Sequence, residues 1–567
     1  MLAIFIIWLY ASAICFIYGC AANRFLLVLL PAKDSEKLPF PLLVILGLCV
    51  VTTGAGYLSL FMKIALGANA LLFLGALLLC AIYRGEITAS LKSGVREFRS
   101  WDKYVFGLFF LSFFFILVKA AAPPSAFDTG LYHAQAIRWI EEYPVIPGLG
   151  NLHGRLAFNS AWFPANALFG FSFLKLQPFH VLNGLFLLLI IFICLEGLSK
   201  IIAGPYRGSD ILRAAIALSA LFVFKDQLSS PTPDIPAALL VCLIFIYYLQ
   251  LREQAGGSPD PAGSIILCLL AAWAITIKLS TLPLSLFIAL IAAQEIARGR
   301  LANSWIIAGG VLFVVVPYLL RNIWLSGYLV YPLPALDLFH FDWQVPRAAA
   351  LAEKRAVEAF ARDPHYVLPQ VHGAFSWVPT WFHQTMADYG SKIEKIFLPG
   401  LIILLDGLLH LLKKKTGRIA LEERGRNTVI YLLAAAGLLF WFFTAPDPRF
   451  GMGFIMIAAV LIFLPLLKAF DYQVTRFFPW SLAVLLLYFM VAFGVQDLPA
   501  IGPRLWLPSP YPQAQLAAEE IQGRQVYFPR SREGKCWYAP LPSAYHPAHF
   551  AFRGPGLADG FKARSAP

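Results

Sequence analysis

Residues 104–133 of the chain read YVFGLFFLSFFFILVKAAAPPSAFDTGLYH, in which a long apolar run is followed at once by prolines, an acid, a phenol and an imidazole. The run at 104–121 has the length and composition of a helix that crosses a bilayer. Asp128, Tyr132 and His133 come directly after it. Ionisable groups held at a membrane surface by a hydrophobic scaffold usually mark a site. This stretch therefore predicts both a membrane fold and a place where function is expected.

The composition of the whole chain agrees with a membrane protein. Hydrophobic residues make up 59% of the 567 residues, only 14% are charged, and the mean hydropathy is +0.69. Residues 1–20 are apolar throughout, without a basic region or a cleavage site, so we expect a retained first span and not a signal peptide. The net charge of +13 lies in short loops rather than in a basic stripe with interleaved aromatics, which argues against a nucleic-acid partner.

The cysteines indicate neither a disulfide framework nor a zinc site. Seven of the eight fall in apolar runs, where a thiol behaves as a small hydrophobe, and Cys536 stands in a polar region.

Apolar runs of about the length of a bilayer-spanning helix recur along the chain. The candidate spans are residues 3–20, 40–60, 64–83, 104–121, 178–202, 211–227, 235–250, 264–279, 281–297, 303–320, 395–412, 428–445, 450–468 and 478–496. The segment Ser160–Leu176, with Pro164 and Asn166, is not counted and is expected to be re-entrant or interfacial. An all-α polytopic membrane protein with about 14 transmembrane helices is therefore predicted.

Basic residues in four loops orient these spans, because loops rich in Lys and Arg stay cytoplasmic. The four groups are Arg24, Lys33 and Lys37; Arg84, Lys92, Arg96, Arg99 and Lys103; Arg298 and Arg300; and Lys413, Lys414, Lys415, Arg418, Arg424 and Arg426. Both termini and all long loops are then expected on the extracytoplasmic side.

This topology divides the chain into five parts. They are the N-terminal helices and their cytoplasmic loop at 1–103, a transmembrane core at 104–320 with a first outer loop at 122–177, a large outer loop at 321–394, C-terminal helices at 395–496, and a small outer tail at 497–567.

Three smaller features are predicted within the outer parts. The alanine-rich, charged stretch Arg347–Arg362 indicates a surface helix. Trp377 and Trp381 are expected on the membrane surface as an interfacial belt, or else stacked on sugar faces. In the tail, residues 526–528 indicate one short strand.

The predicted outer face collects the unusual polar residues of the chain. The candidate site residues are Asp128, Tyr132, His133, His153, Arg155, Asn159, Asp234, Lys278, Arg321, Asp447 and Arg449. Several carboxylates and cations at a membrane surface suit an amphipathic substrate with a phosphate head group, such as a polyprenyl-phosphate sugar. In that chemistry Asp128 is the candidate base for an acceptor hydroxyl, and Lys278, Arg321 and Arg449 are candidates to neutralise the leaving phosphate.

Each of these residues also has an ordinary structural explanation. Asp128 precedes an expected amphipathic helix at Thr129–Tyr143 and could be its N-cap, and Asp234 could cap the next membrane helix. Lys278 and Arg321 could extend to the membrane interface. Asp447 and Arg449 could form only a local ion pair. His133 could simply be solvated or hydrogen-bonded at a helix surface. His153 and Arg155 could be solvated loop residues.

Many short spans, a long first outer loop with an acid just beyond its membrane helix, and a C-terminal outer domain together resemble the GT-C superfamily of glycosyltransferases. The segment Tyr143–Arg155, running on to Asn159 and Ser160, resembles a bacterial branch of that group. The resemblance implies a lipid-phosphate sugar donor, Asp128 as catalytic base, Asp234 as a second acid, and a bacterial inner membrane location. Three spans precede the superfamily's usual first helix, and Thr129 follows Asp128 in place of a second acid, so dependence on a divalent metal stays open.

Two other functions fit the same composition. A transporter or flippase for a lipid-linked precursor is one, although the halves of the chain show no clear repeat and the notable charges lie near the ends of the spans. A non-catalytic assembly protein of the cell envelope is the other. Besides membrane lipids and the lipid-linked sugar, no partner is indicated.

Overall fold

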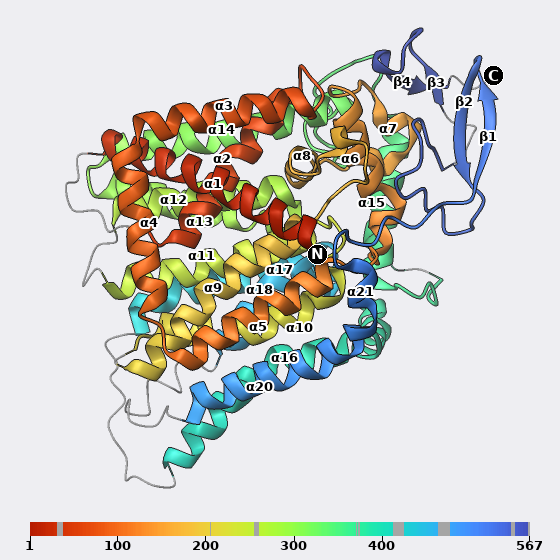
Figure 1. Cartoon of the computed structure of the whole chain (residues 1–567). Coiled ribbons are helices and arrows are strands. Elements are labelled where there is room, and N and C mark those ends of the chain that lie inside the picture. The colour runs from red at the N-terminus through yellow and green to blue at the C-terminus, as the bar shows by residue number, and fades with distance from the viewer. Residues whose placement is uncertain are drawn as a thin grey trace.

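In the computed structural model, most of the chain forms a bundle of long helices, and short helices, loops and two β-hairpins gather at one end of it (Figure 1). The structure describes residues 1–30, 38–204, 206–254, 260–369, 371, 375–411, 424–462, 477–545 and 550–564.

Each predicted span contains a helix of the bundle. These helices are α1 (Leu2–Leu29), α2 (Phe40–Leu58), α3 (Leu66–Ile82), α5 (Lys103–Ala120), α9 (Leu182–Ala203), α10 (Gly208–Phe224), α11 (Asp234–Gln254), α12 (Pro261–Ile277), α13 (Leu284–Ala297), α14 (Leu301–Ser326), α16 (Val378–Leu411), α17 (Arg424–Thr444), α18 (Pro448–Leu461) and α20 (Phe477–Gly494). The last residues of the predicted spans 395–412 and 450–468 lie outside the described residues.

Among the described residues, seven helices are long and apolar enough to cross a membrane. They are Leu2–Leu29, Phe40–Leu58, Lys103–Ala120, Leu182–Ala203, Asp234–Glu253, Leu301–Ser326 and Pro479–Arg504. The count rises to eight if α3 and the bent helix after it form one span. Other apolar helices, among them α12, α13 and α18, are shorter. A mostly helical, multi-pass membrane fold is thus confirmed, and the number of 14 crossings stays a prediction.

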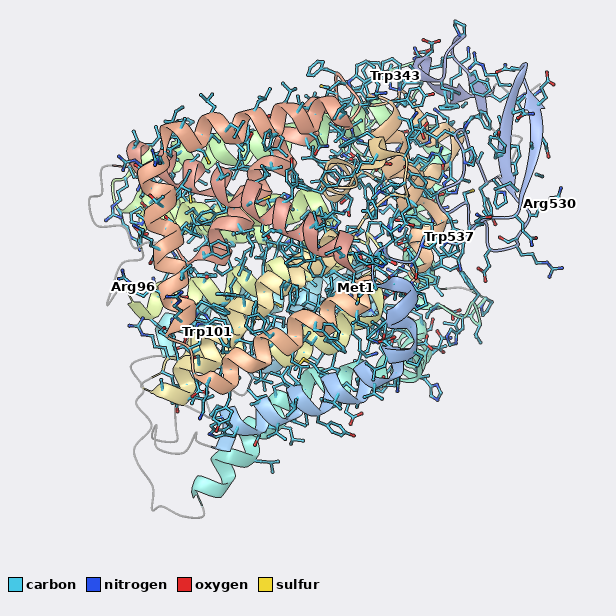
Figure 2. All side chains as sticks on the ribbon, in the orientation of Figure 1. Met1, Arg96, Trp101, Trp343, Arg530 and Trp537 are labelled. Carbon is cyan, nitrogen blue, oxygen red and sulfur yellow. The ribbon has the colours of Figure 1, made fainter. Side chains whose placement is uncertain are left out.

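The basic stretch after α3 is a helix and not the loop that we expected. Helix α4 (Arg84–Arg99) bends away from α3 by 92° and buries none of its residues. It lies at the end of the bundle opposite the hairpins, with Arg96 and Trp101 far from Trp343 and Trp537 (Figure 2). Lys33, Lys37 and residues 413–418 lie outside the described residues, and only the backbone of Arg424 and Arg426 is described.

The other end of the bundle is built from short elements. They are α6 (Ala134–Glu142), α7 (Leu149–Leu152), α8 (Trp162–Leu168), α15 (Arg347–Arg362), and the antiparallel pairs β1 (Leu516–Ile521) with β2 (Arg524–Pro529) and β3 (Phe550–Phe552) with β4 (Phe561–Ala563). The predicted surface helix is α15 and the predicted strand lies in β2. Helix α8 has seven residues, far fewer than the roughly 20 that a crossing needs, which agrees with leaving this segment out of the count.

The tail is part of the folded body rather than a loose appendage. The amide of Leu2 donates to the carbonyl of Leu505 at 2.9 Å, and the amide of Ser509 donates to that of Ala121 at 3.0 Å. Tyr538 donates a hydrogen bond to the buried carboxylate of Glu141. The tail therefore joins α1, the end of α5 and α6.

The two tryptophans at the start of α16 are buried, which excludes both roles that we expected for them. Trp377 and Trp381 are 3% and 9% exposed, and both pack against Phe442 of α17. The indole of Trp381 donates to the carbonyl of Pro446 at 2.8 Å. Neither ring is therefore free to form a surface belt or to stack on a sugar. All eight cysteines are unpaired.

Helices α1 and α2 cross where two glycines let their backbones touch. A Cβ atom on Gly47 would stand 1.6 Å from the carbonyl oxygen of Cys15, and one on Gly19 would stand 1.9 Å from that of Leu43. Small residues at such crossings are the usual means of close helix packing in membranes.

We expect Gly47→Ala to separate α1 from α2 and to destabilise the protein by about 3 kcal/mol, because neither backbone can yield to the added methyl group. Gly54→Ala in the same helix is the control, because no atom lies within 4 Å of its Cβ position. Thermal unfolding in detergent measures both variants. Equal melting temperatures would show that the contact does not hold the two helices.

Candidate functional site

Asp128 lies at the start of a helix that contains a π-helical turn. Helix α5 ends before Pro123 and Pro124, and the chain turns helical again at Phe127. Residues 129–133 form the π turn that leads into α6. Within the described structure the Asp128 carboxylate makes no capping hydrogen bond to this helix, so the N-cap explanation is wrong. Single π turns inside helices are frequent at functional sites, since they redirect side chains locally.

The carboxylate of Asp128 instead pairs with two arginines from distant parts of the chain. Its Oδ2 lies 2.8 Å from Nη1 of Arg449, and its Oδ1 lies 3.5 Å from Nη1 of Arg155. The Asp128 side chain is only 15% exposed. Burial alone would raise the pKa of Asp128, but the charges around it, that of Arg449 above all, outweigh burial and lower the pKa. Asp128 is therefore an ionised carboxylate at neutral pH.

Local contacts fix the positions of both arginines. Asp447 is the N-cap of α18, since it accepts a hydrogen bond of 2.9 Å from the amide of Arg449, and its Oδ2 lies 3.2 Å from Nε of the same residue. The local pair that we expected is thus present, and Arg449 also reaches Asp128. Arg155 lies in a 3-10 turn (Gly154–Ala157). The backbone amide of Arg155 donates a hydrogen bond of 3.1 Å to Nδ1 of His153, which caps this turn.

A second ion pair joins Asp234 at the start of α11 to Lys278 at the end of α12. The ammonium of Lys278 also lies 4.1 Å from the ring centre of Phe450. Lys278 is therefore drawn to a carboxylate and a ring within the protein.

Two pockets flank this group of charges. Asp234, Lys278 and Arg449 line a narrow pocket of about 10 Å³ that continues between α11 and α18 to Val241 and Phe454. Asp447 lines a larger pocket of about 270 Å³. We call Asp128, Arg155, Asp234, Lys278, Asp447 and Arg449 the charged cluster.

Sequence reasoning missed three residues that contact the charged cluster or line a pocket with it. Tyr389 donates a hydrogen bond of 3.2 Å to Asp447, and Lys392 lines the larger pocket beside it. Glu353 of α15 lies 3.9 Å from Nε of Arg155. Tyr389 and Lys392 stand one helical turn apart just before a predicted span, a signal that could have found them.

Tyr132 and His133 lie on the helix of Asp128. The ring of His133 is 2% exposed, packs against Phe163, and its Nδ1 lies 3.3 Å from the hydroxyl of Thr129. Burial, with the nearby cations Lys278, Arg449 and Arg155, lowers the pKa of His133 to about 3, although Asp128 opposes this. His133 is therefore a neutral, buried ring and not a solvated one.

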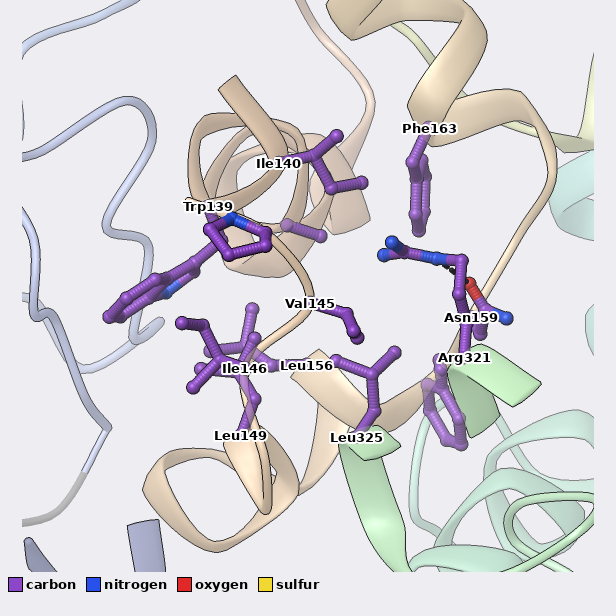
Figure 3. A pocket seen from close by; sticks show the side chains of 13 residues that line it. Trp139, Ile140, Val145, Ile146, Leu149, Leu156, Asn159, Phe163, Arg321 and Leu325 are labelled. Atoms are coloured by element: carbon purple, nitrogen blue, oxygen red, sulfur yellow. Dashed lines mark hydrogen bonds between the residues drawn. The ribbon is translucent and has the colours of Figure 1, made fainter. Parts of the chain in front are cut away.

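Arg321 and Asn159 lie outside the charged cluster. The guanidinium of Arg321 donates to Asn159 Oδ1 at 3.3 Å and to the hydroxyl of Ser59 at 2.6 Å. Arg321 is 4% exposed, so it is not an interface anchor. Both residues line a separate, mostly apolar pocket (Figure 3).

The tail holds the π turn in place. The amide of Trp537 donates to the carbonyl of Gly130 at 2.8 Å, and Gln135 donates to the carbonyls of Trp537 and Ala539 at 3.1 and 2.9 Å. The compact aromatic segment around Cys536 therefore braces the helix that carries Asp128.

Among the described residues, no group of three or more His, Cys, Asp and Glu side chains is placed to hold a metal ion. The three aspartates of the charged cluster, Asp128, Asp234 and Asp447, are each paired with Arg or Lys instead.

We expect Gly130→Ala to loosen the tail, because its Cβ would stand 2.9 Å from the ring of Trp537. A cost of about 1 kcal/mol would raise the open population about fivefold. The rate of tryptic cleavage after Lys535 measures this opening. Gly107→Ala, with no atom within 4 Å of its Cβ position, is the control. Unchanged cleavage in Gly130→Ala would mean that the ring does not brace the turn.

His133 should make the protein less stable in acid. The unfolded chain binds a proton at His133 near pH 6.5, whereas the folded protein binds it only near pH 3, so this contribution to stability is complete above pH 6.5 and is lost as the pH falls. The melting temperature of His133→Gln should therefore fall less than that of the wild type between pH 7 and pH 5. Parallel curves for the two proteins would contradict the assignment.

The family comparison covers every residue of the charged cluster. A search of the curated proteins finds no match to the chain. The family model described as "Domain of unknown function (DUF8201)" matches residues 1–456, from α1 into α18. The chain therefore belongs to the DUF8201 family.

Proposed function

We propose that the protein is an integral membrane glycosyltransferase of the GT-C type. It transfers a sugar from a polyprenyl-phosphate donor to an envelope acceptor at the outer face of a bacterial inner membrane. One observation carries the proposal: Asp128, which caps no helix within the described structure, lies between two arginines beside a pocket that enters the apolar bundle.

In the proposed reaction, Asp128 takes the proton of an acceptor hydroxyl. The acceptor oxygen forms a bond to the anomeric carbon as the bond from that carbon to the phosphate oxygen breaks. The electron pair of the broken bond leaves with the polyprenyl phosphate. Arg449, Arg155 and Lys278 are placed to stabilise the charge that develops there.

The same ion pairs support a role for the donor in activating the base. A carboxylate with a lowered pKa is a weak base. The charges of Arg449 and Arg155 lower the pKa of Asp128. A bound phosphate would draw both guanidinium groups toward itself, since arginine binds phosphate through paired hydrogen bonds. The pKa of Asp128 would then rise, and the base would become stronger only with the donor in place.

The larger pocket suits a sugar or the acceptor, because it is lined by the polar side chains of Asp388, Tyr389 and Lys392. The charged cluster lies beside it, where the phosphate would be, and the smaller pocket leads from there toward the apolar bundle between α11 and α18.

We expect Asp128→Asn to lower sugar transfer at least about 100-fold while the protein stays folded, because the amide cannot accept the proton. The assay offers a panel of polyprenyl-phosphate hexoses and pentoses to the protein in vesicles and measures release of polyprenyl phosphate.

Asp226→Asn is the matched control, because this acid lies near the same loop but its side chain is 55% exposed and pairs only with the adjacent Lys225 in the described structure. Full transfer by Asp128→Asn would refute the base assignment. Movement of intact donor between leaflets without release of polyprenyl phosphate would favour the transporter.

A further inference from the structure

A large pocket lies where four segments meet: the link between α2 and α3, the end of α6, the loop after α8, and the tail. Its volume is about 610 Å³. Lys63 of the link, Arg138 of α6, Lys175 and Leu176 of the loop, and Tyr538 of the tail are among the residues that line it. No residue of the charged cluster does, so this pocket is a separate site.

Two cations of this pocket are free of acidic partners. The acids that line it are engaged: Oε1 of Glu142 lies 2.6 Å from Nε of Arg138, and Glu141 is buried and accepts a hydrogen bond from the tail. Lys63 and Lys175 are exposed, and in the described part of the chain neither forms an ion pair. Both ammonium groups are therefore available to an anion that enters the pocket.

Exposed apolar side chains stand beside both lysines. Leu176 lines the pocket and is 65% exposed, and Leu174, next to Lys175, is 53% exposed. Phe61, two residues before Lys63, is 82% exposed. The link follows α2, which is long and apolar enough to cross a membrane, so the link lies at the membrane surface. Basic and apolar side chains together at that level are typical of a surface that contacts lipid head groups and the acyl chains next to them.

The backbone of the loop after α8 is strained at the pocket. Phe171 and Lys175 have φ angles of +49° and +55°, in the left-handed region that residues with a Cβ atom rarely adopt. Such conformations persist only where the surrounding structure holds them, and they cluster at functional sites. Here one of the two strained residues is itself a lysine that lines the pocket.

We propose that this pocket binds the head group of an anionic membrane lipid. The phosphate would lie between Lys63 and Lys175, and the acyl chains would cover Leu176 and its exposed neighbours. The bound lipid would join the link between α2 and α3 to α6, the helix that continues from the π turn after Asp128. The proposal rests on the membrane fold and not on the proposed function.

The test titrates the full chain in detergent with phosphatidylglycerol or phosphatidylcholine of the same acyl chains and measures bound lipid by native mass spectrometry. Phosphatidylglycerol should bind at least about tenfold more tightly, because the choline group cancels the phosphate charge. Replacing both Lys63 and Lys175 by Gln should weaken its binding about 25-fold, since each lysine near an anionic head group contributes a factor of about five. Replacing both Lys92 and Lys562 by Gln is the control, because these lysines are exposed and lie outside the pocket.

Leu176→Gln tests the apolar part of the site with both lysines in place. It should weaken phosphatidylglycerol binding about fivefold, because the exposed leucine would lose its contact with the acyl chains. All of these side chains are exposed, so every variant should melt with the wild type.

Four results would overturn the proposal. They are equal binding of the two lipids, wild-type binding when Lys63 and Lys175 are both replaced, an equal loss in the control, and displacement of phosphatidylglycerol by an equal concentration of glycerol phosphate. The last result, or unchanged binding in Leu176→Gln, would show that the pocket takes a free anion and not a lipid.

Discussion

The end of the bundle that carries the charged cluster depends on one contact, the ion pair between Asp128 and Arg449. It joins residues 321 positions apart, so it brings the loop after α5 against the start of α18. Both partners are mostly buried, which makes an unpaired partner costly and the contact specific. Arg155, Asp447 and Lys278 are arranged around this pair, and the two pockets lie on either side of it.

Local composition was enough to predict most of the helices. Apolar runs locate the bundle helices, because the hydrophobic content of a segment can be read without knowing what packs against it. The alanine and charged residues of α15 locate that helix, because their helix propensity is also a local property. The grouping of Asp128, Asp234, Lys278, Asp447 and Arg449 was also predictable. Orienting the spans by their basic loops puts all five at one end of the bundle.

The features that the sequence did not reveal depend on side-chain direction and on long-range packing. Arg321 and Arg449 both lie near helix ends, yet one points into an apolar cavity and the other to Asp128. Trp377 and Trp381 looked like surface aromatics because their partner, Phe442, lies some sixty residues later in the chain. The bend that makes α4 a separate helix, and the tail contacts on Gly130, are likewise set by the assembled fold.

The contact of the tail with the π turn has a consequence for biogenesis. A chain leaves the ribosome N-terminus first, at roughly 5 to 20 residues per second. Asp128 and its helix are therefore made well before Trp537, whose amide completes the hydrogen bonding of Gly130, has been synthesised. The site region cannot reach its final form until the tail has been made, so its assembly has to wait for the segment around Trp537.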